Sequence, residues 1–250
     1  MKQASFLDTP QGRRIAYHCT PGQAPGLVFL GGLMSDMCGT KAVHLDAWAR
    51  ANGRAFLRLD YSGHGQSSGD FVDGAIGDWA EDAMAAISAL TTGPQVLVGS
   101  SMGGWISLLV LRNMPDRVAG LVGIAAAPDF TEDSMWAGFD AAQRTELATK
   151  GILYLPSDYD EPYPISKRLI EEGRGHLVLR APIAARVPVR LLQGTDDRDV
   201  PQSVALRLLA QLDGPDIALS LVKGADHRFS EPAQLARIDV AVAEVLASHG

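Results

Sequence analysis

Short apolar runs alternate along the chain with longer stretches whose apolar residues recur every three or four positions. The runs predict strands, most of them buried on both faces, at 27–30, 55–59, 95–99, 118–124, 189–193 and 217–222. The longer stretches have the spacing of one-sided helices, at 41–51, 78–90, 102–112, 204–212 and 234–248. Because strands and helices alternate, we expect an α/β fold with a mainly parallel sheet and helices on both of its faces.

The N-terminal part of the chain has a different pattern. Residues 5–7 and 14–18 are apolar enough for strands, and Pro10, Gln11 and Gly12 lie between them. Proline and glycine favour a tight turn at such a position. The pattern therefore predicts an antiparallel hairpin that opens the sheet.

The segment 129–182 contains no clear strand, although it keeps aromatic residues among its charged ones. A structureless loop of this length is uncommon in a compact domain. We therefore expect a small helical insertion, a cap or lid at 129–182, on a core formed by 1–128 and 183–250. Its aromatic side chains either bind substrate or fill the interior of the cap. The candidate substrate-binding residues are Trp136, Tyr154, Tyr159 and Tyr163.

Composition excludes several classes of protein. The chain has 250 residues, of which 46% are hydrophobic and 20% charged, as expected for a globular protein with a sizeable core. A formal net charge of −7 and the absence of Lys and Arg runs disfavour a nucleic-acid partner. The two cysteines, Cys19 and Cys38, lack the spacing of a metal site or a disulfide framework. Nothing in the composition indicates the oligomeric state.

The apolar segments are too short for a membrane span. None approaches the ~18 residues that a transmembrane helix needs. The first residues include Asp8, Pro10 and Gly12, which interrupt any apolar core of a signal peptide. We therefore expect a cytoplasmic protein without a membrane span.

Ser101 lies between a predicted strand and a predicted helix, at the centre of Gly99-Ser100-Ser101-Met102-Gly103. A Gly-x-Ser-x-Gly sequence in this context forms a sharp turn that exposes the central hydroxyl as a nucleophile. The N–H groups at the start of the following helix favour negative charge beside it. The alternative is a glycine-rich helix start without chemistry. Ser100 lies off the centre of the motif, and we expect it to be structural.

A serine hydroxyl becomes a strong nucleophile only beside a base that an acid orients. In proteins with this turn the order along the chain is Ser, Asp or Glu, His. Among the histidines, His227 and His249 follow the last predicted strands, and His249 is next to the C-terminal residue, where chains fray. His227 follows the strand 217–222 directly, at the edge where α/β sheets form their sites. We therefore predict His227 as the base, the alternative being a solvent-exposed loop histidine.

Three aspartates compete for the role of the acid. Asp196, Asp197 and Asp199 all follow the strand 189–193. Asp196 directly adjoins the strand end, and Asp199 is close enough to Pro201, which suits a first helical turn, to serve as a cap. Asp197 remains by elimination and by the order along the chain. It would hold the imidazole tautomer and stabilise the imidazolium that forms.

The oxyanion of an acyl transfer needs two N–H donors. One comes from the residue after the nucleophile and the other from the loop after an early strand. These are the backbone N–H groups of Met102 and Leu33, the latter in Gly31-Gly32-Leu33-Met34. The alternative is a simple glycine turn between strand and helix.

Several motifs resemble those of the α/β-hydrolase family. They include Asp60-Tyr61-Ser62-Gly63-His64-Gly65-Gln66-Ser67 after an early strand and the segment 194–201, whose Gly-x-x-Asp-x-x-Val-Pro pattern selects Asp197. The sequences around Gly39, Ser101, Leu155 and His227 are similar to the mitochondrial palmitoyl-protein thioesterase group of abhydrolase-domain proteins, which is also described as mycophenolic acid acyl-glucuronide esterase. The similarity extends over most of the chain. We expect this chain to differ from the mitochondrial proteins in lacking a transit peptide, and its first helix follows Gly31-Gly32-Leu33 where many relatives have a His-Gly start.

The resemblance implies a serine hydrolase of acyl thioesters or carboxylic esters, with Ser101, Asp197 and His227 as its triad. Its substrates would be small molecules or acylated proteins. The alternatives are a general carboxylesterase for small apolar esters and a module of the same fold that binds a ligand without turnover. No metal or cofactor is expected, because no phosphate-binding glycine loop and no ligand cluster is present.

Overall fold

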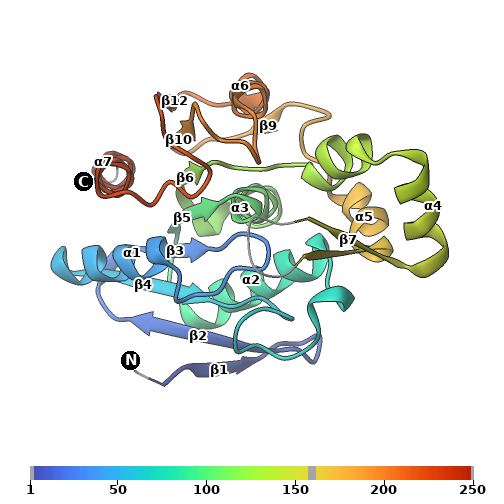
Figure 1. Cartoon of the computed structure of the whole chain (residues 1–250). Helices are drawn as coiled ribbons and strands as arrows, with labels where there is room; N and C mark the ends of the chain where they lie inside the picture. The colour runs from blue at the N-terminus through green and yellow to red at the C-terminus, as the bar shows by residue number, and fades with distance from the viewer. Residues whose placement is uncertain (1–2, 157–161, 249–250) are drawn as a thin grey trace.

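The computed structural model describes residues 3–156 and 162–248, and its centre is an eight-stranded sheet (Figure 1). The strand order is β1-β2-β4-β3-β5-β6-β10-β12. The hairpin strand β2 pairs antiparallel with both β1 and β4, and the other neighbours are parallel. The strands are β1 (Ser5–Asp8), β2 (Arg14–Thr20), β3 (Gln23–Leu30), β4 (Arg54–Leu59), β5 (Gln95–Ser100), β6 (Val118–Ile124), β10 (Val189–Gly194) and β12 (Ile217–Val222). The predicted fold class is confirmed.

Helices cover both faces of this sheet. Side chains of α1 (Thr40–Ala51) and α7 (Pro232–Ala247) form one apolar cluster with one face. The other face packs against α2 (Ile76–Leu90), α3 (Met102–Asn113) and α6 (Gln202–Gln211). The central strands β5 and β6 are buried along their whole length. Because successive side chains of a strand point to opposite faces, they supply both clusters.

The segment 129–182, which we call the cap segment, connects β6 to β10 and differs in part from the expectation. It contains helices, but also the antiparallel strands β7 (Ile152–Leu155) and β8 (Tyr163–Ser166). Each has four residues, too few for an alternating pattern to be visible in the sequence. The helical elements are a π-helical turn η3 (Thr131–Trp136), α4 (Ala141–Lys150), α5 (Lys167–Gly173) and η4 (Arg174–His176).

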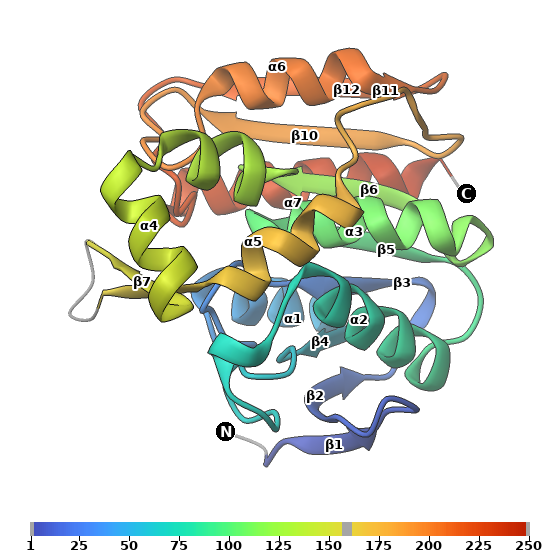
Figure 2. The same cartoon turned by 90° about the vertical axis from the view of Figure 1, so that its right-hand side faces the viewer.

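The cap segment lies at one end of the sheet, where Figure 2 shows α4 and β7 projecting together beyond the strands. Its buried residues Leu153, Ile165 and Leu169 belong to the same apolar cluster as Trp105 of α3. The cap segment therefore shares the main core instead of having one of its own.

The remaining elements are short. They are the parallel pair β9 (Ile183–Ala184) and β11 (Leu212–Asp213), and the 3₁₀ turns η1 (Phe71–Asp73) and η2 (Pro115–Arg117). Both cysteines are free thiols. Within the described residues, no helix is long and apolar enough to cross a membrane.

Candidate active site

Ser101 lies at a strained turn between β5 and α3. Its φ of 54° and ψ of −120° place a residue with a side chain in a region that glycine normally occupies. Close packing holds the turn, because a Cβ added to Gly103 would lie 1.9 Å from the carbonyl oxygen of Leu30. A Cβ added to Gly104 would lie 2.5 Å from the Cβ of Ala126. The two glycines therefore let α3 begin directly against the sheet, with the Ser101 side chain at its N-terminus.

His227 reaches Ser101 from the loop after β12. Its Nε2 atom lies 3.0 Å from the Ser101 Oγ, although 126 residues separate the two along the chain. The loop is anchored by the buried side chains of Ala225 and Phe229 on either side of it. The amine of Lys41 also donates a hydrogen bond to the carbonyl oxygen of Arg228. The predicted base is thus held within hydrogen-bonding distance of the predicted nucleophile.

Asp197 is the aspartate that meets this histidine. Its Oδ2 lies 2.9 Å from Nδ1 of His227, and its side chain is fully buried. The other oxygen, Oδ1, accepts the backbone N–H groups of Asp199 and Val200 at 3.0 and 2.8 Å. Burial acts to raise the pKa of Asp197, but the hydrogen bonds from His227 and Val200 outweigh it and hold the pKa below its ordinary value. An ionised carboxylate therefore faces the imidazole.

Neither of the other two candidate acids forms a hydrogen bond to His227 in the described structure. Asp199 is exposed and contacts Asp197 through its backbone N–H, while the carboxylate of Asp196 accepts only a weak bond of 3.4 Å from the Thr195 hydroxyl among the described residues. The structure thus brings together the three residues chosen from the sequence.

Gln193 is a residue of this site that the sequence pattern did not reveal. It lies near the end of β10, is fully buried, and its Nε2 donates to Asp197 Oδ2 at 2.9 Å and to the carbonyl oxygen of Val200 at 3.0 Å. A polar side chain directly after the apolar pair Leu191 and Leu192 was the available signal, because buried amides almost always have a hydrogen-bond partner.

The two predicted oxyanion donors border the same space as Ser101. Leu33 and Met102 both line the cavity that contains Ser101 and His227. A Cβ added to Gly32 would lie 3.4 Å from the Cβ of Ser101, so the loop after β3 passes directly beside the nucleophile. Among the hydrogen bonds of the described residues, none uses the N–H of Leu33 or Met102. Both groups are available to a substrate oxygen.

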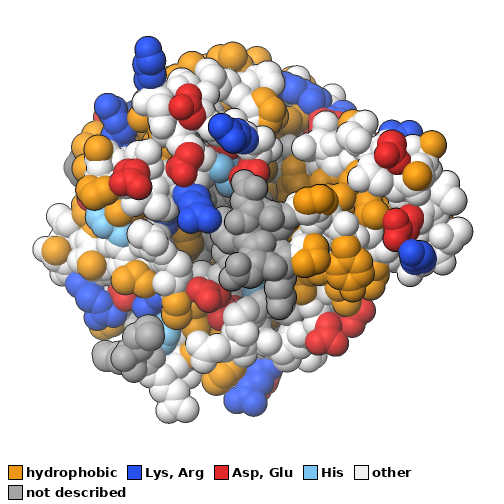
Figure 3. All heavy atoms as spheres, viewed as in Figure 1, with side chains coloured by type: hydrophobic (Ala, Val, Ile, Leu, Met, Phe, Trp, Pro, Cys, Tyr) orange, Lys and Arg blue, Asp and Glu red, His pale blue; other side chains and the backbone are white. Residues whose placement is uncertain are grey.

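The cavity around Ser101 has a volume of about 1060 Å³ and is lined by two chemically different segments. The cap segment supplies mainly apolar lining residues: Phe130, Ser134, Met135, Leu155, Pro156 and Tyr163. The loops after β10 and β12 supply most of the charged ones, namely Asp196, Asp197, Arg198, Asp199, Asp226 and Arg228. In Figure 3 hydrophobic side chains gather to the right of the centre of the view, on the side of the cap segment, and charged side chains are frequent to the left of the centre.

Of the aromatic residues expected to bind substrate, Tyr163 alone lines this cavity among those the structure describes. Trp136 is instead packed between the guanidinium groups of Arg144 and Arg174, each 4.9 Å from its ring centre. Tyr154 is 62% exposed and is not among the lining residues. Tyr159 lies outside the described residues. The apolar wall is therefore formed mostly by other side chains of the cap segment.

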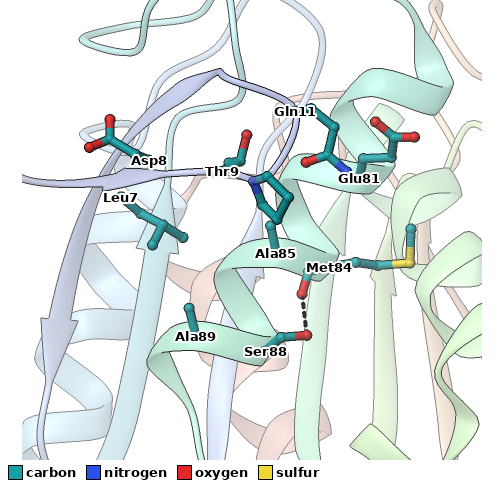
Figure 4. A pocket seen from close by; sticks show the side chains of 10 residues that line it. Leu7, Asp8, Thr9, Gln11, Glu81, Met84, Ala85, Ser88 and Ala89 are labelled. Carbon is teal, nitrogen blue, oxygen red and sulfur yellow. Dashed lines mark hydrogen bonds between the residues drawn. The ribbon is translucent and has the colours of Figure 1, made fainter.

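A second hollow lies between β1 and α2 (Figure 4). It measures about 500 Å³ and is lined by residues such as Leu7, Gln11, Glu81 and Met84. Its lining includes no histidine, cysteine or basic side chain, so it offers no nucleophile with a base. The cavity around Ser101 is therefore the candidate active site.

Two triad residues, Asp197 and His227, also belong to the group of side chains that most resembles a metal site within the described part of the chain. Ligand atoms of Asp197, Asp199 and His227 lie within 4.8 Å of one another. However, Asp197 Oδ2 and His227 Nδ1 are already bonded to each other, and Nε2 faces the serine. This geometry suits proton transfer between serine and imidazole better than ion binding.

Comparison with curated proteins finds thioesterases. The chain is 36% identical over 233 residues to "Palmitoyl-protein thioesterase ABHD10, mitochondrial" of Rattus norvegicus, which covers 92% of this chain and 78% of the rat protein. Its identity to the Homo sapiens protein of the same name is 35%, over 92% of this chain and 76% of the human one.

Solved structures agree with this relationship. A putative hydrolase from Agrobacterium vitis superposes with a TM-score of 0.94 at 38% identity, over 97% of this chain and 98% of that one. Mouse alpha/beta hydrolase domain-containing protein 10 superposes with a TM-score of 0.92 at 32% identity, over the full length of both chains. The sequence pattern of the alpha/beta hydrolase family matches residues 27–238. With the sheet, the cavity and these relatives in agreement, the chain belongs to the α/β hydrolase family.

Proposed function

We propose that the chain is a serine hydrolase that cleaves acyl thioesters or carboxylic esters through an acyl-enzyme on Ser101. The observation that supports this best is the position of His227, which lies 3.0 Å from the Ser101 hydroxyl and 2.9 Å from the Asp197 carboxylate. A base bonded on one side to a nucleophile and on the other to a buried acid is the arrangement that activates serine.

In the first half of the reaction, the Ser101 oxygen forms a bond to the acyl carbon while His227 accepts the hydroxyl proton. The negative charge that develops on the acyl oxygen is stabilised by the N–H groups of Leu33 and Met102. When the tetrahedral intermediate collapses, the bond to sulfur or oxygen breaks and His227 gives its proton to the leaving group. Asp197 stabilises the imidazolium throughout.

In the second half, water replaces the leaving group. His227 removes a proton from water as its oxygen bonds to the acyl carbon, and then returns the proton to Ser101 as the acid departs. The apolar residues of the cap segment suit the acyl group, while the charged loops after β10 and β12 suit a polar leaving group. The similarity to the palmitoyl-protein thioesterases favours a thioester as the substrate.

Labelling with a fluorophosphonate tests the nucleophile. Wild-type protein should be modified at Ser101, and Ser101→Ala should not be. Ser134→Ala is a matched control, because this variant also removes a hydroxyl that lines the same cavity. If folded wild-type protein were not labelled, the proposed nucleophile would be wrong, and the alternative of a module that binds a ligand without turnover would be favoured.

Turnover of paired substrates then tests the bond that is cleaved. The same acyl group is presented as a thioester and as an oxygen ester, over a series of chain lengths. A preference for thioesters is the expected result. Faster cleavage of short oxygen esters would instead identify a carboxylesterase for small apolar esters.

A further inference from the structure

The loop after β4 contacts the oxyanion loop at three points. Residues 60–67, a motif already noted in the sequence, face residues 31–37. The Tyr61 hydroxyl lies 3.4 Å from the carbonyl oxygen of Gly31, and Asp60 Oδ1 accepts the N–H of Met37 at 2.6 Å. Between them, His64 Nε2 accepts the N–H of Met34 at 3.2 Å. One loop thus supports the other along its whole length.

The partners of His64 define its protonation state. Nδ1 lies 3.1 Å from the carbonyl oxygen of Ser62, which can only accept, so Nδ1 has the proton. The N–H of Met34 can only donate, so Nε2 must present its lone pair. His64 is therefore a neutral imidazole with one tautomer.

The surroundings of His64 favour this neutral form. The side chain is nearly fully buried, and the rings of Tyr61, Phe71 and Trp79 pack edgewise against it at 5.0–5.6 Å between ring centres. Burial lowers the pKa of His64, although the bond to the Ser62 carbonyl acts in the opposite direction. The imidazole is thus held rigidly as a hydrogen-bond acceptor.

The backbone that His64 holds is strained. Met34 has a φ of 55°, a left-handed conformation that is unfavourable for a residue with a side chain. Such a conformation persists only where the surrounding structure holds it, and the bond from the Met34 N–H to His64 is one of the contacts that does so. The peptide that precedes Met34 is therefore fixed in place.

The peptide on the other side of Leu33 is fixed as well. The carbonyl oxygen of Gly32 accepts both the N–H and the hydroxyl of Ser35, at 3.2 and 2.8 Å. In a trans peptide the C=O and N–H point in opposite directions, so the N–H of Leu33 points away from Ser35. Leu33 is consequently held on its N-terminal side by Ser35 and on its C-terminal side by His64.

We propose that His64 is a positioning residue, which holds the Leu33 N–H where it donates to the oxyanion formed at Ser101. This inference rests on the proposed function. His64 does not touch the substrate; it acts by accepting the Met34 N–H, which keeps the neighbouring peptide preorganised before the charge develops.

Two substitutions separate this role from packing. His64→Gln keeps an acceptor oxygen at a similar distance from the backbone. His64→Leu fills the space between the rings of Tyr61, Phe71 and Trp79 but has no acceptor. We expect His64→Leu to lower kcat by about 10- to 100-fold and to change KM little. This decrease does not exceed the one caused by removing a whole oxyanion donor. His64→Gln should recover most of the rate. Because the surrounding rings are apolar, the free energy of unfolding in urea should be at least as large for His64→Leu as for His64→Gln.

A trifluoromethyl ketone gives a readout that packing would not change. It adds to the serine as a tetrahedral adduct whose oxyanion needs the same donors. Its inhibition constant should weaken in His64→Leu by the factor lost in kcat. His44→Leu is the control, because His44 pairs with Asp239 between α1 and α7 and does not line the cavity.

The outcomes distinguish the two proposals. If wild-type protein neither reacts with a fluorophosphonate nor turns over esters, the proposed function fails. If it does both, and His64→Leu matches either wild type or His64→Gln in kcat and ketone binding, the positioning role alone is wrong.

Discussion

The carboxylate of Asp129 accepts the backbone N–H of Val178 at 2.8 Å, which joins the two ends of the cap segment across 49 residues. Its second oxygen accepts the N–H of Leu179 at 2.9 Å and contacts Arg180 at 3.1 Å. Asp129 is fully buried and has a φ of 58°. Burial raises the pKa of this carboxyl, and its two backbone hydrogen bonds only partly offset the increase.

Substituting Asp129 should therefore destabilise the fold. Asp129→Asn keeps one acceptor but turns an NH₂ group towards a buried N–H, and we expect a loss of about 1–3 kcal/mol. Urea unfolding measures this loss. Asp133→Asn is the control, since Asp133 is exposed and, within the described residues, its carboxylate bonds to arginine side chains and to no backbone N–H. Equal stability of Asp129→Asn and wild type would show that the bonds from Asp129 to Val178 and Leu179 do not stabilise the fold.

The raised pKa of Asp129 also has a consequence for pH. A carboxyl whose pKa is higher in the folded than in the unfolded protein favours folding most when it is protonated. Its contribution is therefore complete below the ordinary pKa of 3.8 and is lost as the pH rises through the higher folded value. The stability difference between wild type and Asp129→Asn, measured across that range, should follow this direction. A difference that grows in wild type's favour at higher pH would show that the hydrogen bonds outweigh burial.

Asp197 should be the one aspartate of its loop that matters for the rate. Asp197→Asn favours the wrong imidazole tautomer, and kcat should fall by about 10⁴-fold. Asp199→Asn and Asp196→Asn should change kcat by no more than a few fold, because neither carboxylate reaches His227 Nδ1 in the described structure. Steady-state kinetics on one activated ester decides the matter. A larger loss at Asp199 would assign the acid to that residue.

Gln193 should affect both the stability of the protein and the pH dependence of its rate. Gln193→Leu removes a donor to Asp197 and to the Val200 carbonyl, and we expect a loss of about 1–3 kcal/mol in stability. Gln193→Glu places a second carboxyl against Asp197, which raises the pKa of the pair. The acidic limb of the kcat/KM profile should then move to higher pH. An unchanged limb in a folded Gln193→Glu variant would separate Gln193 from the triad.

The apolar side of the cavity should select the acyl chain. Leu155→Ala should weaken transition-state binding of long acyl chains by about 1–3 kcal/mol and that of acetyl esters far less. Tyr154→Ala is the matched control, because Tyr154 is the adjacent residue of β7 and is largely exposed. The measurement is kcat/KM over a series of chain lengths. Equal losses for short and long chains would show that Leu155 supports the fold and not the substrate.

The core of the fold was predictable because its signals are strong. A strand buried on both faces gives a continuous apolar run, and 118–124 coincides with β6, whose residues are all buried. The run 217–222 coincides with β12, which lies at the edge of the sheet and is only partly covered. Weak signals failed where the elements are short or begin with unusual residues. β3 starts at Gln23, four residues before the predicted position, because Pro25 and Gly26 are typical of turns and hid its beginning.

The candidate site was predictable where chain order restricts it and not where packing decides. Ser101, Asp197 and His227 follow from one turn motif and a fixed order. The residues of the cap segment that line the cavity could not be predicted from its aromatic residues. The π-helical turn at 131–136 places Met135 in the cavity lining, whereas Trp136 packs against two arginines. The rotation of such a turn is not encoded in hydrophobic spacing. The expected cytoplasmic location stays a prediction.

The shared core of the cap segment restricts how a substrate can arrive. Because Leu153, Ile165 and Leu169 are buried with Trp105, swinging the cap away as a rigid lid would expose the centre of the molecule to water. Such an opening would cost a large part of the stability of a protein of this size. We therefore expect the described part of the cap segment to stay in place when a substrate enters, so that single side-chain changes in the cavity lining, and not movement of the cap, alter which acyl groups fit.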